Sequence, residues 1–282
     1  MFDAMNFEQL LHLNRWSRIN FLNSHQLIDW ELTWSLLNYF PETHTTATNF
    51  NQSASFCFNV KLISDELPWL SVLQTRNPAL YLPEWNCLLC HNDKEDYTHI
   101  WSCAAIQDTI TNYITNAKLL FMTRLRKELV NVSQSIETHI LQQDCWSLSN
   151  GDTSIISLDL MIKGFVPTTL LPALANCGNK QQVRMALIKA LTDIRKLFHQ
   201  EVWLKRCHEF ALGVTSVGIT KQDKKKGSHH FGTRNTSAQS RTEHTSQYPP
   251  NSPRWKKWIA RALSDGIPWM GFHIYINSLV FR

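Results

Sequence analysis

The segment CLLCHNDKEDYTHIWSC, residues 87–103, holds three of the chain's seven cysteines and two of its twelve histidines. Within it, Cys87, Cys90, His99 and Cys103 spell C-x2-C-x8-H-x3-C. Two cysteines three apart can point both sulfurs at one ion from a tight turn, and a histidine and a cysteine four apart share one face of a helix. Three thiolates and a neutral histidine fill a tetrahedral shell. The spacing therefore predicts one zinc ion with a structural, non-catalytic role.

An alternative interpretation is that Cys87 and Cys90 are ordinary small hydrophobic residues and that His99 is polar surface. A lone C-x2-C would favour that alternative, whereas the paired spacing favours a metal site. His91 is a rival ligand beside Cys90, less suited because adjacent residues point in different directions. We expect the second nitrogen of His99 to face one of three nearby carboxylates, on Asp93, Glu95 or Asp96.

Positive charge is concentrated in one segment. The formal net charge is +5, but residues 221–261 hold ten Lys or Arg against Asp223 and Glu243, a local charge of +8 that leaves −3 for the rest. Such a segment favours contact with polyanions. Its Lys and Arg side chains can neutralise phosphates without recognising a particular nucleotide sequence, and its tryptophans can stack on unpaired bases of DNA or RNA. The candidate nucleic-acid-binding residues are Lys224, Lys225, Lys226, Arg254, Trp255, Lys256, Lys257 and Trp258.

The cysteine pattern and the hydropathy predict an intracellular protein that does not enter a membrane. The seven cysteines are odd in number and unevenly spaced, which fits reduced thiols better than a disulfide framework. The first residues, MFDAMNFEQL, lack the pattern of a signal peptide, and no run approaches 18 apolar residues. Nucleus and cytoplasm both stay open.

Apolar residues recur at helical spacing over much of the chain, which predicts a mainly α fold: a helical domain nucleated by a single small zinc site. The region from 219 to 253 has few large apolar residues and predicts disorder. The expected organisation is N-terminal helices in 1–40, a loop in 41–55, a helical zinc-binding region in 56–146, a loop-rich connection in 147–180, a long helix in 181–218, a disordered basic linker in 219–253 and an aromatic basic tail in 254–282.

Two long amphipathic helices carry the strongest periodicity. The first is expected from about residue 97 to about residue 130, with Asp96 or Thr98 as its N-cap, so that His99 lies in its first turn. The second begins near residue 181 and is expected to stop at Gly213.

Three further expectations concern single positions. Ser24 is available as the N-cap of the helix that carries Trp30 and Trp34. Pro68 is expected near the first turn of a short helix, after a break. In WLKRCHEF, we expect Cys207 in the core and Arg206 on the surface.

The region from residue 62 to residue 103 resembles the zinc-binding region near the end of reverse transcriptases encoded by LINE-type (non-LTR) retroelements. Trp69 stands where that family usually shows Thr. A looser likeness extends to EVWLKRCHEF and GITKQDKKKG. The resemblance implies a module downstream of a polymerase core that helps to grip template or target nucleic acid. The matching positions are Leu67, Pro68, Leu73, Arg76, Cys87, Cys90, Glu95, His99 and Cys103.

The sequence predicts no enzyme activity. A polymerase needs a carboxylate pair to hold two metal ions, and no Asp-Asp pair occurs in the 282 residues. Asp159 and Lys163 lie near each other without the pattern of a retroelement nuclease. We therefore expect a non-catalytic zinc-binding, nucleic-acid-associated module.

The alternative function is a zinc-stabilised helical protein that binds a protein partner, through the Trp-bearing tail 254–282, with no nucleic-acid role. Attachment of this tail to a membrane surface would need a sustained amphipathic helix, and Asp265, Gly266 and Pro268 interrupt one.

Overall fold

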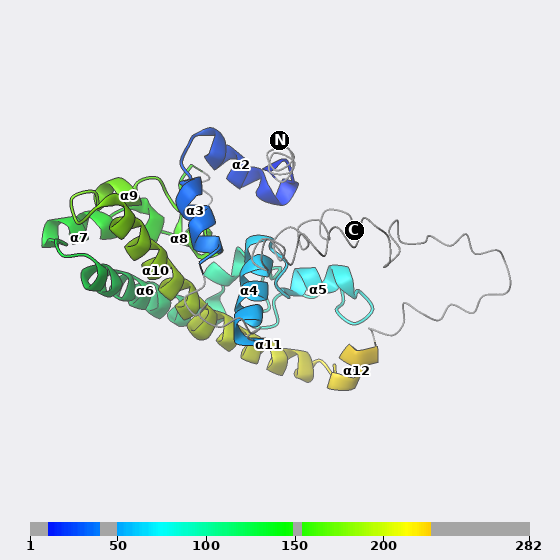
Figure 1. Cartoon of the computed structure of the whole chain (residues 1–282). Coiled ribbons are helices and arrows are strands. Elements are labelled where there is room, and N and C mark those ends of the chain that lie inside the picture. The colour runs from blue at the N-terminus through cyan, green and yellow to red at the C-terminus, as the bar shows by residue number, and fades with distance from the viewer. Residues whose placement is uncertain (1–10, 40–49, 149–153, 227–282) are drawn as a thin grey trace. The chain divides into compact units, whose positions relative to one another are not determined.

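A computed structural model describes residues 11–39, 50–148 and 154–226. These residues form helices and no β-strand, with one isolated bridge between Ile28 and Pro167 (Figure 1). The predicted mainly α class is confirmed.

The chain divides into two units, Met1–Gly227 and Ser228–Arg282, and the described residues all belong to the first. The disordered linker predicted for 219–253 is wrong at its start, because residues 221–226 form a short helix, α12 (Lys221–Lys226). The rest of this linker and the predicted tail 254–282 lie outside the described residues. In the part of the chain that is described, no helix has the length and apolar character needed to cross a membrane.

The N-terminal helices are short and separated by a turn. Asp29 is the N-cap of the third, and its carboxylate accepts a hydrogen bond from the backbone N–H of Leu32 at 2.9 Å. Ser24, expected in that role, is the last residue of the preceding helix, because Gln26 adopts a left-handed conformation (φ 55°) and turns the chain between them. The elements are η1 (Asn14–Trp16), α2 (Ser17–Ser24) and α3 (Trp30–Leu37).

Two helices precede the cysteine segment, α4 (Phe50–Ile63) and α5 (Leu70–Arg76). Pro68 lies in the break between them, two residues before α5, close to its expected place. The loop predicted for 41–55 is wrong from residue 50 onwards, because α4 already includes these residues. Asn and Ser lower helix propensity by only a few tenths of a kcal/mol each (about 0.5), too little to stop a helix that continues into an apolar stretch.

The first long helix, α6 (Gln107–Glu128), begins ten residues later than the expected start near residue 97. Two single 3₁₀ turns precede it, η2 (His99–Trp101) and η3 (Ala104–Ile106). Between them Cys103 has an extended backbone (φ −64°, ψ 116°), which no α-helix accommodates. This bend turns the cysteine back toward Cys87.

Short helices fill the connection that follows. All six residues of α8 are buried, including two charged side chains that find partners. Arg18 lies 3.1 Å from the Asp159 carboxylate, and Lys163 lies 2.5 Å from the Asp65 carboxylate. The elements are α7 (Gln134–Leu141), η4 (Asp144–Trp146), α8 (Leu158–Lys163) and α9 (Leu170–Ala173).

The second long helix is a continuous rod with a π-turn inside it. It does not stop at Gly213, as predicted, but continues to Ser216, and Gly218 follows in a left-handed conformation (φ 86°) that suits a helix terminus. A capping box between Asn179 and Gln182 fixes its start. Its parts are α10 (Lys180–Phe198), the π-turn η5 (His199–Trp203) and α11 (Leu204–Ser216), and α12 (Lys221–Lys226) follows.

The fold has a large main core and a smaller second core. In the main core α6 packs along α10, where the Tyr113 hydroxyl donates to the Ile194 carbonyl at 3.1 Å (Figure 1). The second core lies between α5, the segment after it and α11. Its buried members are Leu70, Tyr81, Leu88, Phe210, Val214 and Ile219.

Candidate metal centre

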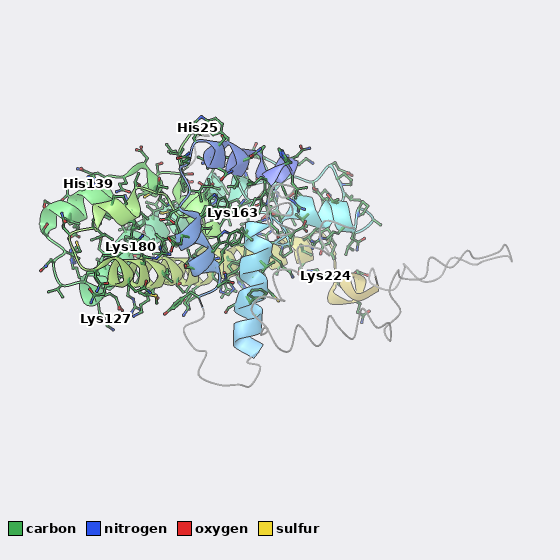
Figure 2. All side chains as sticks on the ribbon, turned by 45° about the horizontal axis from the view of Figure 1, so that its top comes forward. His25, Lys127, His139, Lys163, Lys180 and Lys224 are labelled. Carbon is green, nitrogen blue, oxygen red and sulfur yellow. The ribbon has the colours of Figure 1, made fainter. Side chains whose placement is uncertain are left out.

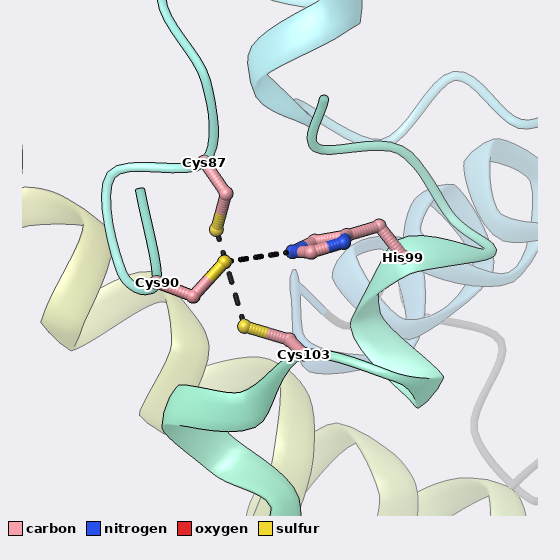
Figure 3. Close-up of side chains that lie close together, drawn as sticks. All are labelled: Cys87, Cys90, His99 and Cys103. Carbon is pink, nitrogen blue, oxygen red and sulfur yellow. Dashed lines mark hydrogen bonds between the residues drawn. The ribbon is translucent and has the colours of Figure 1, made fainter. Parts of the chain in front are cut away.

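The structure brings the four predicted ligands together at one point (Figure 3). Their ligand atoms all lie within 4.8 Å of one another. The Cys87 and Cys103 sulfurs are 4.0 Å apart, and the Cys90 sulfur is 3.4 Å from Nε2 of His99. We call these four residues the Cys3His cluster. This cluster could hold one metal ion.

The first two ligands sit on a turn that closes on itself within the ligand loop, residues 77–98, which joins α5 to η2. The Cys87 N–H donates to the Asp93 carbonyl at 2.7 Å, and the His91 N–H donates to the Cys87 carbonyl at 2.8 Å. His91 has a left-handed backbone (φ 62°) and an exposed side chain, and it is not part of the cluster. Both cysteine side chains therefore point to the same side of the turn.

The last two ligands come from the bend before α6, not from one face of an α-helix as predicted. Asp96 fixes the approach of His99, since its carboxylate accepts a hydrogen bond from the His99 N–H at 2.8 Å. Nδ1 of His99 lies 4.0 Å from the Asp93 carboxylate, so of the three expected acceptors Asp93 faces the ring. This orientation leaves Nε2 for the cluster.

Burial and backbone hydrogen bonds shift the pKa values of the cluster thiols in opposite directions. Burial raises the pKa of Cys87 to about 12 and also raises the pKa of Cys103. At Cys90 burial also raises the pKa, but hydrogen bonds from the backbone of Asn92 and Asp93 and from the thiols of Cys87 and Cys103 together outweigh it, so the pKa falls below its ordinary value. Backbone groups two and three residues later donate to Cys87 as well. Because a metal ion binds thiolates, it would displace the protons of the buried thiols.

Comparisons with known proteins found no relative of this chain. No protein-family model, no curated protein and no solved structure matches the chain. The likeness to retroelement zinc regions therefore rests on the residues themselves.

A buried ion pair beside the centre was missed from the sequence. Arg206, expected on the surface, is 2% exposed and bonds through Nε to the Glu95 carboxylate at 2.5 Å. Cys207, expected in the core, is only partly buried. Helical spacing could have predicted the burial of Arg206. This residue follows Trp203 by three positions and precedes Phe210 by four, so it lies on the apolar face of the helix.

Aromatic rings surround the guanidinium of Arg206. Its central carbon lies 5.4 Å from the ring centre of Trp69, 5.3 Å from Trp203 and 4.2 Å from Phe210. Trp69 and Trp203 also meet edge to face at 4.9 Å. Trp69 is 1% exposed and packs against Arg206 of α11.

The candidate nucleic-acid-binding residues fall almost entirely outside the described side chains. Lys224 is exposed on α12 (Figure 2). Lys225 and Lys226 belong to the same helix, and their side chains are not described. The remaining five lie outside the described residues: Arg254, Trp255, Lys256, Lys257 and Trp258.

Proposed function

We propose that the Cys3His cluster binds one zinc ion, which has a structural role. The observation that supports it is the convergence of three sulfurs and one imidazole nitrogen within 4.8 Å. A zinc ion with Zn–S bonds of about 2.3 Å in a tetrahedron separates two sulfurs by about 3.8 Å. The 4.0 Å between the Cys87 and Cys103 sulfurs fits this edge and is about twice the length of a disulfide bond. Thiolate and imidazole ligands favour zinc over calcium or magnesium.

The ion would stabilise the fold and not catalyse a reaction. Four protein ligands saturate a tetrahedral shell, so no position is free for water or a substrate. The ion would join the ligand loop to the bend before α6, two segments that contain neither a long helix nor a strand.

We expect protein purified in zinc-containing medium to carry one zinc ion per chain. Chelation should remove the ion and reduce the helical circular dichroism signal, because binding of a structural metal is coupled to folding. Elemental analysis and a chelator titration would measure both quantities. Protein that is folded, free of metal and unable to take up added zinc would contradict the proposal.

We further propose that the chain is a non-catalytic, nucleic-acid-associated module similar to the C-terminal part of a retroelement reverse transcriptase. Two features support it. The ligand spacing and the preceding Leu67, Pro68, Leu73 and Arg76 follow that family's zinc region. The basic segment 221–261 continues from the helix that packs on the ligand loop, and it carries the charge that phosphate binding requires.

Binding to single-stranded oligonucleotides should be strongly salt-dependent and tolerant of sequence. Each phosphate contact adds about −0.7 to the slope of log K against log salt. The triple variant Lys224→Ala, Lys225→Ala, Lys226→Ala should therefore make the slope shallower by about 2. Fluorescence anisotropy between about 50 and 200 mM salt measures the slope.

A matched control removes the same charge from exposed positions of the folded unit, Lys127, Lys196 and Lys205. This control should keep the slope of the unaltered protein. Absence of binding, or equal effects of the two triple variants, would count against the nucleic-acid role of the segment and favour the protein-partner alternative.

A further inference from the structure

The C-terminal half of α11 packs directly on the ligand loop. Leu88, which lies between the two cysteine ligands Cys87 and Cys90, is a member of the second core together with Phe210 and Val214 of α11. The ligand loop itself contains no helix and no strand. Its position therefore depends on the side chains that it buries and on the bonds that it makes to its neighbours.

Helix and loop approach each other so closely at Gly213 that any side chain there would press on the loop. A Cβ atom at Gly213 would lie 3.0 Å from Cβ of Leu88 and 3.2 Å from the Leu88 carbonyl oxygen. The carbonyl belongs to the backbone and cannot rotate away as a side chain can. Because Leu88 directly follows Cys87, any shift that relieves this contact displaces a ligand.

A second connection joins the same two segments through charge. The buried Glu95 carboxylate of the ligand loop bonds to Arg206 of α11. The Glu95 carbonyl in turn accepts from the Ser71 N–H of α5 at 3.1 Å. The ligand loop is therefore fixed to α11 at two points, on either side of Cys90.

We infer that α11 positions the metal ligands and that the metal ion in return holds residues 207–216, most of α11, on the ligand loop. Gly213 and Arg206 are the positioning residues. The inference rests on the proposed zinc site and adds a coupling between that site and a helix that supplies none of its ligands. Such coupling is reciprocal. Zinc binding must therefore stabilise the packing of α11 on the ligand loop, and this packing must in turn raise the affinity for zinc.

The response should be local because α10 is anchored independently of the metal. Tyr113 of α6 donates to the Ile194 carbonyl of α10, and Arg124 of α6 pairs with Asp193 of α10 at 2.6 Å. These contacts lie outside the segments that carry the four cluster residues. Residues 207–216 have the second core as their main support, and that core includes the segment between the cysteine ligands.

Hydrogen exchange of the full chain, with zinc bound and after chelation, tests the inference. Amides of 207–216 should lose protection by about tenfold or more on chelation, while those of α6 and α10 keep theirs. Unchanged protection of 207–216 after the metal has left would overturn the inference and leave the zinc site standing. Equal loss throughout the chain would overturn it too, because the ion would then hold the whole fold. Failure to bind zinc would overturn both proposals.

The reciprocal test measures zinc affinity by competition with a chromogenic chelator. Gly213→Val should weaken binding by about tenfold, within the usual range for coupled sites. Ala211→Val is the matched control, because it places the same β-branched residue in the same helix at an exposed position and should leave the affinity unchanged. Gly213→Ala is a milder variant that raises helix propensity, so weaker zinc binding in it can only reflect the contact with Leu88. Equal affinities of Gly213→Val and Ala211→Val would overturn the inference.

Discussion

His99→Ala protein should purify without zinc and unfold about 8–16 °C below the unaltered protein. The estimate follows from linkage, since a ligand at about 1,000 times its Kd stabilises the folded state by about 4 kcal/mol. Cys90→Ser should behave in the same way, because a serine hydroxyl does not replace a thiolate on zinc. Zinc content by elemental analysis and Tm by circular dichroism measure the two effects together.

The neighbouring histidine offers a matched control. His91 is exposed, directly follows Cys90 and lies outside the cluster. His91→Asn keeps a residue that tolerates the left-handed backbone there, and it should retain zinc and the original Tm. A His99→Ala protein that kept its zinc, or that lost it without a fall in Tm, would show that the ion has no structural role.

Breaking the buried ion pair should have the second large effect. Glu95→Leu leaves the Arg206 guanidinium buried without its acidic partner, and Arg206→Met does the same to the carboxylate. Each single change should lower the free energy of unfolding by about 3–5 kcal/mol. The double variant should be far closer to the unaltered protein, because two apolar side chains of similar volume leave no uncompensated charge. Urea denaturation at constant free zinc measures all four proteins.

A surface pair provides the comparison for this cycle. Arg76, whose side chain is 49% exposed, pairs with Glu66, which also pairs with Arg15. Arg76→Ala removes one of these pairs and should cost less than about 1 kcal/mol, as exposed pairs do. If the losses in the double variant simply added, Glu95 and Arg206 would contribute as separate residues and not as a pair.

The clustering of Cys87, Cys90, His99 and Cys103 could be predicted from the sequence because the pattern that indicates it is local. C-x2-C and H-x3-C each describe a short stretch, and the spacing restricts how each stretch can bend. The backbone that presents them was predicted less well. The periodicity after residue 97 continues smoothly into α6, so it predicts one helix, whereas Cys103 is extended and His99 lies in a 3₁₀ turn. The bend that the cluster requires overrides the propensity for a continuous helix.

The support of the site could not be predicted because it is non-local. Glu95 and Arg206 are 111 residues apart, and neither carries a local sign that the other is near. Gly213 was interpreted as a helix terminus, which is the commonest role of a glycine after an apolar stripe. In the structure it lies within the helix and permits the close approach of Leu88. Glycine is suited both to ending a helix and to close packing within one. Only the tertiary contact with Leu88 shows which role Gly213 has.

The π-turn of the long rod has a consequence for the metal centre. Buried positions recur every four residues along this part of the rod, and in a regular α-helix each step of four advances a side chain by about 40° around the axis. Four such steps would carry Val214 about 160° away from the direction of Phe198. The wider η5 turn absorbs part of this drift. If the same residues formed a regular α-helix throughout, everything beyond η5 would be rotated by up to about 100°. The ligand loop would then face the polar side of α11. The buried positions are Phe198, Val202, Arg206, Phe210 and Val214.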